Sequence, residues 1–241
     1  QVARMPFLKR LVGVFTAPRP VFESLRVHPA ILGMLLLNLA CFLGSYVAIA
    51  PIITRVQIEK AQEAIDRNEN IPADQKEEIV AKQERMMNST AMKIIIPATG
   101  ALFTIGGAFF WALIVMLGIN FMLGGQVSYR QSLSTALHVA PILMVAGGLL
   151  KTPLILATKN LYAPTSLALA LPEADPQSPL FAALNTVDIF VIWSLVVLTI
   201  GVSAISGFST AKSRAVSIMI FVVAFLFSVG GAMLGKAMSG G

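Results

Sequence analysis

Charged residues and cysteine are scarce in this sequence. Only 12% of its 241 residues are charged and 56% are hydrophobic, whereas soluble domains usually carry about 25% charged residues. This composition excludes an ordinary water-soluble globular domain. The single cysteine, Cys41, lies within an apolar stretch, so no intrachain disulfide can form.

Motifs that carry common enzyme chemistry are also missing. The sequence contains no Gly-x-x-x-x-Gly-Lys-Ser/Thr loop, no His-Glu-x-x-His and no Gly-x-Ser-x-Gly, so ATP hydrolysis and common hydrolase reactions have no basis in it. It also lacks the basic patch interleaved with aromatic residues that is typical of nucleic-acid binding. We therefore expect a protein with no catalytic residues, no cofactor, no metal site and no nucleic-acid partner.

Five long apolar stretches dominate what is present. A helix needs about 20 apolar residues to cross a hydrocarbon core about 30 Å thick, and transmembrane strands would alternate in polarity instead. The first stretch is about 24 residues long, which exceeds a signal-peptide core, so we expect it to be a retained span. The sequence predicts an all-α polytopic membrane helical bundle with five transmembrane helices, at residues 30–53, 94–123, 132–157, 180–206 and 215–234.

The segment before the first span is amphipathic. Apolar side chains from Phe7 to Phe15 fall on one broad helical face with Arg4, Lys9 and Arg10 beside it, which is typical of a helix at a membrane interface. Prolines then break this helix, and we expect a second short surface helix to carry Phe22 and Leu25. Residues 1–29 are therefore predicted to be an interfacial segment.

A polar segment, residues 54–93, separates the first two spans. It is rich in Glu, Gln, Lys and Ala, which favour helix, and Asn70-Ile71-Pro72 breaks it near the middle. We expect an external helical hairpin with arms at 55–68 and 73–88, which contacts another protein; the alternative is a solvated spacer. The residues most suited to partner contact are Ile65, Ile79, Val80, Met86 and Met87.

Basic residues predict the orientation of the chain. The amino-terminal segment and the loops after the second and fourth spans hold eight basic residues and one acidic residue, Glu23, and short basic loops face the cytoplasm. The amino terminus is therefore expected in the cytoplasm, with the hairpin, the carboxyl terminus and the loop 158–179 outside. That loop is rich in proline, and its apolar part is too short to span, so we expect it to cap the membrane surface. The eight basic residues are Arg4, Lys9, Arg10, Arg19, Arg26, Arg130, Lys212 and Arg214.

Two charged residues, Lys151 and Asp188, lie within the predicted third and fourth spans. Charges inside a membrane are costly and usually pair or face a wet cavity. Lys151 is about six residues from the outer end of its span and Asp188 about eight from the outer start of the next, so antiparallel neighbours would place them level. We expect an ion pair. Such a pair either registers two helices or serves transport or proton coupling, and Lys151 alone could instead extend to the interface.

Other intramembrane residues have structural explanations. His138 can titrate near neutral pH, but no second His, Cys or nearby carboxylate has ligand spacing, so we expect an interhelical or interfacial hydrogen bond. Asn120 has the same interpretation. Glycines in the second, third and fifth spans predict close helix packing, with a hinge or a partner-helix face as the alternative.

Four ordered stretches resemble the Yip domain family of small polytopic membrane proteins. The first runs from Phe15 to Leu25 and is followed by His28-Pro29; the second runs from Gly124 to Leu133 and is followed by Ala140-Pro141. The third is Thr186-Val-Asp-Ile-Phe-Val-Ile-Trp193, and the fourth is the basic loop from Ser209 to Ala215. Their order and spacing extend over most of the chain outside the hairpin.

This resemblance implies five spans, a cytoplasmic amino terminus and no enzymatic activity. Bacterial members look like accessory proteins of ABC-type exporters in some cases. Our leading hypothesis is a non-enzymatic accessory or scaffold subunit in a bacterial inner membrane, bound to the bilayer and to a membrane-protein partner such as an ABC-type exporter with its periplasmic adaptor. The alternative is a small transporter, channel or lipid-handling protein that uses polar residues between the third and fourth spans.

Overall fold

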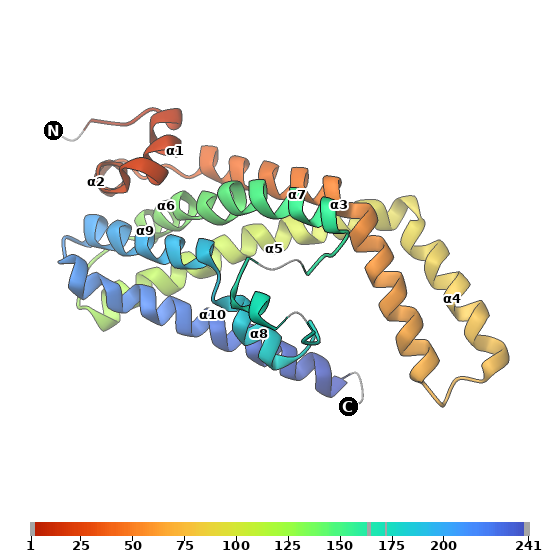
Figure 1. Cartoon of the computed structure of the whole chain (residues 1–241). Coiled ribbons are helices and arrows are strands. Elements are labelled where there is room, and N and C mark those ends of the chain that lie inside the picture. Colours follow the sequence, from red (N-terminus) through yellow and green to blue (C-terminus); the bar gives the residue numbers. More distant parts are fainter. Residues whose placement is uncertain (1–2, 163–164, 172, 239–241) are drawn as a thin grey trace.

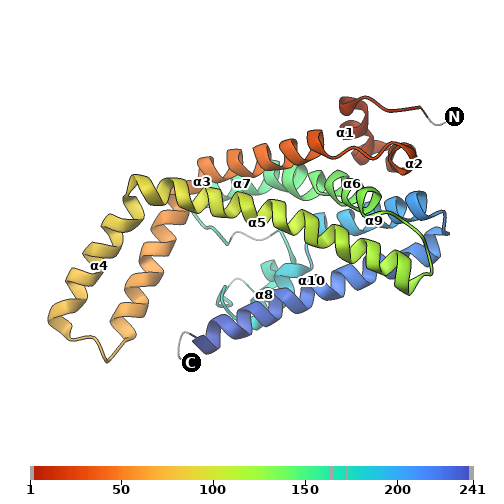
Figure 2. The same ribbon diagram turned by 180° about the vertical axis from the view of Figure 1, so that it is seen from behind.

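Long helical segments lie side by side in one bundle (Figures 1 and 2). The structure, a computed structural model, describes residues 3–162, 165–171 and 173–238. Five of its helical segments are long and apolar enough to cross a membrane: Leu32–Arg67, Thr90–Met122, Tyr129–Thr158, Ile189–Ser206 and Thr210–Ala237. Within the described residues there are no strands, only one isolated bridge between Ser166 and Asp188. The predicted all-α bundle with five spans is confirmed.

Two short helices, α1 (Phe7–Thr16) and α2 (Pro18–Val27), cover one end of this bundle, here called the amino-terminal end (Figure 1). Ala17 separates them because a residue before proline avoids the helical region, while Pro18 is well placed at the first position of α2. The second short helix expected to carry Phe22 and Leu25 is present as α2, with Arg19, Glu23 and Arg26 exposed on its outer side. The Phe22 and Leu25 side chains are fully buried, because α2 packs against α9 (Ile189–Ser206).

The helical hairpin projects from the opposite end, here called the hairpin end (Figures 1 and 2). Its first arm is the continuation of the long helix α3 (Leu32–Arg67), and its second is α4 (Ala73–Asn88). The turn at residues 68–72 contains Pro72, which precedes the first residue of α4. A hydrogen bond of 2.6 Å from the Lys76 ammonium to the carbonyl of Asp66 closes this turn. The expected hairpin is therefore present, with two arms packed on each other.

The next two spans are helices with local irregularities. Helix α5 (Thr90–Leu117) ends in the π-helical turn η1 (Gly118–Met122). The third span begins as α6 (Tyr129–Val139), passes through the π-helical segment η2 (Ile142–Gly147) and ends as α7 (Gly148–Thr158). Pro141 lies directly before η2 and has no N–H to donate, so the regular hydrogen-bond ladder is interrupted there.

The residues predicted as the fourth span form two helices. Helix α8 (Pro179–Thr186) is followed by a break at Val187 and Asp188, and only α9 continues through the bundle. The 3-10 helix η3 (Leu167–Ala170) precedes α8 on the hairpin end, and α8 packs on the final helix, α10 (Thr210–Met238). Leu167, Leu169 and Leu180 are exposed on this segment, as is typical of a cap that lies on a membrane surface.

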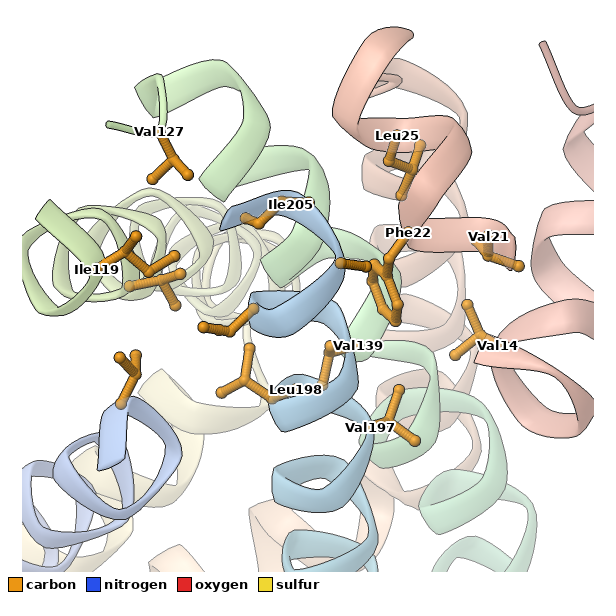
Figure 3. Packing of buried hydrophobic residues seen from close by; sticks show 14 of the residues in the cluster. Val14, Val21, Phe22, Leu25, Ile119, Val127, Val139, Val197, Leu198 and Ile205 are labelled. Carbon is orange, nitrogen blue, oxygen red and sulfur yellow. The ribbon is translucent and has the colours of Figure 1, made fainter. Parts of the chain in front are cut away.

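The main apolar core sits near the amino-terminal end, around α9 (Figure 3). It combines Val14 of α1 and Phe22 of α2 with Leu198 and Val202 of α9. A Cβ atom added at Gly201 would lie 3.2 Å from the Phe22 ring, so the absence of a side chain there permits α2 to approach α9. This packing fixes the two short helices to the bundle.

Candidate functional site: an ion pair at the hairpin end

An ion pair joins the third and fourth spans at the hairpin end. The ammonium nitrogen Nζ of Lys151, in α7, lies 3.0 Å from Oδ2 of Asp188, the residue that precedes α9. The pairing expected from their matched depths is present in the structure. Each charge therefore reduces the cost of removing the other from water.

Asp188 has partners on both carboxylate oxygens. Its Oδ1 accepts a hydrogen bond of 2.8 Å from the backbone N–H of Phe190, and Oδ2 accepts one of 2.5 Å from the hydroxyl of Thr165. The first bond caps the amino-terminal end of α9, where the helix dipole favours negative charge. The Asp188 side chain is only 2% exposed, and each oxygen of this buried carboxylate has at least one partner.

The two members of the ion pair differ in their exposure to solvent. The Lys151 side chain is 40% exposed, whereas that of Asp188 is buried. The arrangement can hold α7, α9 and the segment between them in register. Among the described residues, no group of three or more His, Cys, Asp or Glu side chains could hold a metal ion.

The segment after α7 folds back onto Asp188. The backbone N–H of Leu167 donates to the carbonyl of Val187 at 3.0 Å, and the Ser166 hydroxyl donates to the side-chain oxygen of Asn185 at 2.9 Å. Together with the Thr165 bond, these contacts place a loop directly over the start of α9. Such contacts between a loop and the start of a helix cannot be read from hydropathy, and sequence reasoning missed them.

This loop also contacts the base of the hairpin. The Arg55 guanidinium of α3 donates to the carbonyl of Lys159 at 3.1 Å. The Lys60 ammonium donates to the Tyr162 hydroxyl and lies 4.9 Å from the centre of the same ring, and Tyr162 packs edge-on against Phe181 of α8. A continuous set of contacts therefore links the first arm of the hairpin to the segment that holds Asp188.

His138 and Asn120 lie elsewhere. His138 is fully buried in α6, where Nδ1 donates at 2.7 Å to the carbonyl of Ser134, one turn earlier in the same helix, and not across helices or at the interface as expected. Lys151 follows it almost four helical turns later, about 20 Å along a helix. Asn120 bonds both backbone groups of Val127, at 2.8 and 3.0 Å, and so closes the loop after η1. The structure does not bring either residue to the ion pair.

The five proposed partner-contact residues of the hairpin differ in exposure. Ile65 and Met87 are buried between the arms, at 9% and 8% exposure, while Ile79 and Val80 are half-buried. Met86 is 49% exposed. Of these five, Met86 presents the largest fraction of its surface to a partner.

Comparison with known proteins identifies the family. The Yip1 domain matches residues 12–232 of the chain. The membrane protein YknW of Bacillus subtilis (strain 168) is 30% identical over 224 residues, which cover 91% of this chain and 88% of YknW. No solved structure matches the chain. The matched residues include the hairpin and reach into all five spans, and the chain therefore belongs to the Yip1 domain family of membrane proteins.

Proposed function

We propose that this protein is a non-enzymatic subunit of a bacterial inner-membrane complex, and that its partner is an ABC-type exporter with a periplasmic adaptor. The observation that carries the proposal is the projecting hairpin (Figure 2). Its two arms, the part of α3 beyond Ile53 and the whole of α4, are each roughly four helical turns long, or about 20 Å. A projection of this size serves contact with another molecule better than it serves packing of the bundle.

The hairpin is weakly stabilised by its own contacts. From Arg55 to Asn88, the buried side chains among the described residues are Ile65 and Met87. Helices of this length, below or barely above about 15 residues, are marginal when isolated in water. A partner that covers Met86 and the half-buried residues beside it would supply the missing burial.

The charge of the hairpin favours a protein partner over an anionic surface. Residues 54–93 contain seven basic and eight acidic residues, so the segment is close to neutral. Strong binding to nucleic acid or to anionic lipid needs a basic excess. Mixed charges around an exposed apolar side chain are typical of the rim of a protein interface.

The proposal includes the orientation of the chain across the membrane. The excess of basic residues over the single acid Glu23 favours a cytoplasmic amino terminus, so the hairpin would face the periplasm, where an adaptor is found. Cysteine labelling in intact cells tests this. A cysteine at Asn70 should react with an impermeant reagent while one at Ser209 stays protected, and the reverse pattern would exclude the orientation.

Cross-linking and deletion test the partner. A photo-reactive residue at Met86 should cross-link to an exporter or adaptor subunit, identified by mass spectrometry, whereas one at the exposed, mid-span Leu226 should cross-link to lipid. Replacing Gln57 to Arg85 by a short Gly/Ser linker should leave five inserted spans and abolish co-purification. Unchanged co-purification from a correctly inserted deletion protein, or cross-linking to protein only from Leu226, would show that assembly uses the spans.

A transporter, channel or lipid-handling protein is the second candidate, favoured by the half-exposed Lys151 beside a buried carboxylate. A charge with access to a wet cavity is a common feature of ion and substrate pathways. The purified protein in liposomes should then move a solute, and Lys151→Met should abolish that flux. Flux that does not depend on Lys151 would remove this candidate site.

A further inference from the structure

A groove of about 500 Å³ runs between α9 and α10 on the lipid-facing side of the bundle. Its walls include Ile192, Val196 and Ile200 of α9, with Ile218 and Phe221 of α10. Ile192, Val196 and Ile218 are each more than half exposed. The groove is therefore apolar and open at the surface of the bundle, and it is not part of the protein core.

The polar groups in the walls are already paired. The hydroxyls of Thr199 and Ser217 line the groove and lie 2.8 Å apart, hydrogen-bonded to each other. Both residues are nearly fully buried. The middle of the groove consequently offers apolar surface and no free polar group from this pair.

The end of the groove at the amino-terminal end of the bundle is different, because Thr210 and Arg214 line it. Both are exposed, and the structure shows no ion pair for Arg214 within the described residues. Neighbouring charges are engaged elsewhere: Lys212 donates to the Leu123 carbonyl and lies 4.0 Å from the Phe208 ring centre. The single acid of this end, Glu23, lies 3.7 Å from Arg19.

The groove is longer on α9 than on α10. On α10 its lining runs from Thr210 to Phe221, three helical turns or about 17 Å, which is close to half of a hydrocarbon core about 30 Å thick. On α9 the lining continues past Ile192 to Val187, at the hairpin end of that helix. Arg214 is in the second turn of α10, near the depth at which lipid phosphates lie when the helix crosses the membrane.

We propose that this groove binds an anionic phospholipid of the leaflet at the amino-terminal end. The lipid phosphate pairs with the Arg214 guanidinium and accepts a hydrogen bond from the Thr210 hydroxyl, and one acyl chain lies along the apolar walls towards Phe221. Charge complementarity selects this occupant. An exposed cation, Arg214, lies at headgroup depth at one end of the groove, and the rest of the groove has apolar walls without free polar groups.

Lipid retention tests the proposal. The full-length protein is placed in nanodiscs that contain equal amounts of phosphatidylglycerol and phosphatidylcholine, and native mass spectrometry counts the lipids that remain after mild extraction. Arg214→Gln should reduce the preference for phosphatidylglycerol roughly fivefold, equivalent to about 1 kcal/mol for one basic residue at a membrane surface. The matched control is Arg130→Gln, which removes another exposed cation of the same end that does not line the groove.

A second variant blocks the groove itself. Ile218→Trp places a large ring in the channel from a position that is 56% exposed, so the core should remain intact and the melting temperature unchanged. It should reduce retention of both lipids, whereas Arg214→Gln should change only their ratio. The proposal is overturned if Arg130→Gln lowers the preference as much as Arg214→Gln does, or if Ile218→Trp retains the wild-type number of lipids.

Discussion

The two ends of this molecule are stabilised to very different degrees. At the amino-terminal end, α1 and α2 bury Val14, Phe22 and Leu25 completely against the spans. At the hairpin end, α4 buries Met87 and α3 buries Ile65 beyond the bundle, while much of the rest of both arms is exposed. One end is therefore held by burial against the spans, and we infer that the other gains its remaining contacts from a partner.

The largest effect is expected from Phe22→Ala. Loss of this fully buried ring should lower the free energy of unfolding by about 3–5 kcal/mol, measured by SDS-induced unfolding in mixed micelles. Ile65→Ala is the matched truncation in the hairpin. Because the hairpin can open locally without unfolding the bundle, Ile65→Ala should leave the global transition in place, and an equal loss in both variants would contradict the distinction between the two ends.

A smaller effect is expected for the ion pair. In a double-mutant cycle, Lys151→Met and Asp188→Leu should show a coupling of about 1–3 kcal/mol, because either single change leaves a charge without its partner. The control cycle uses Glu63→Gln and Arg67→Met in the hairpin, an exposed pair 3.8 Å apart. Its coupling should be below about 0.5 kcal/mol. Simple additivity for Lys151 and Asp188 would show that their contact contributes nothing.

Glycine substitutions refine the comparison within the spans. A Cβ at Gly201 would lie 3.0 Å from Thr135 Cγ2 of α6 and 3.2 Å from the Phe22 ring of α2, whereas one at Gly230 meets no atom within 4 Å. Gly201→Val should therefore cost about 1–3 kcal/mol through overpacking, and Gly230→Val should change stability by less than about 0.5 kcal/mol. Thermal unfolding in detergent compares the two, and equal shifts would mean that close approach of α2 and α9 is unimportant.

The smallest effect on stability is expected at Met86. Met86→Gln changes an exposed side chain and should alter the free energy of unfolding by less than about 0.5 kcal/mol, in the same unfolding assay. It should nevertheless reduce recovery of the partner in pull-down experiments. Gln83→Asn, a conservative change on the same helix, provides the control, and equal recovery with Met86→Gln and wild type would exclude Met86 as a contact.

Much of the fold could be predicted because apolar length and helical composition are strong signals. The five spans, the hairpin with its break near Pro72 and the level placement of Lys151 and Asp188 all follow from spacing along the chain. The glycines were less predictable. Gly118 would meet Met219 and Val216 if it carried a Cβ, as close packing predicts, but Gly106 and Gly107 would meet no atom within 4 Å.

Features that depend on tertiary contacts were not predictable. The break at Val187 and Asp188 interrupts the predicted fourth span, and it exists because the Asp188 carboxylate caps α9 and binds Thr165 and Lys151. Burial of Phe22 depends on the approach that Gly201 permits. Hydropathy reports whether a residue is apolar, but not which helix, loop or lipid covers it.

Helix α9 is short because it begins only after the break at Asp188, and its length also affects the surrounding bilayer. Its 18 residues measure about 27 Å, whereas an average hydrocarbon core is about 30 Å thick. Ile189 and Ile192, on its lipid-facing side, are more than half exposed. We therefore expect the lipid beside α9 to thin to match it, which brings the headgroup layer and its water closer to Lys151. Hydrophobic mismatch of this kind favours thinner membranes and creates a local depression in the bilayer on one side of the protein.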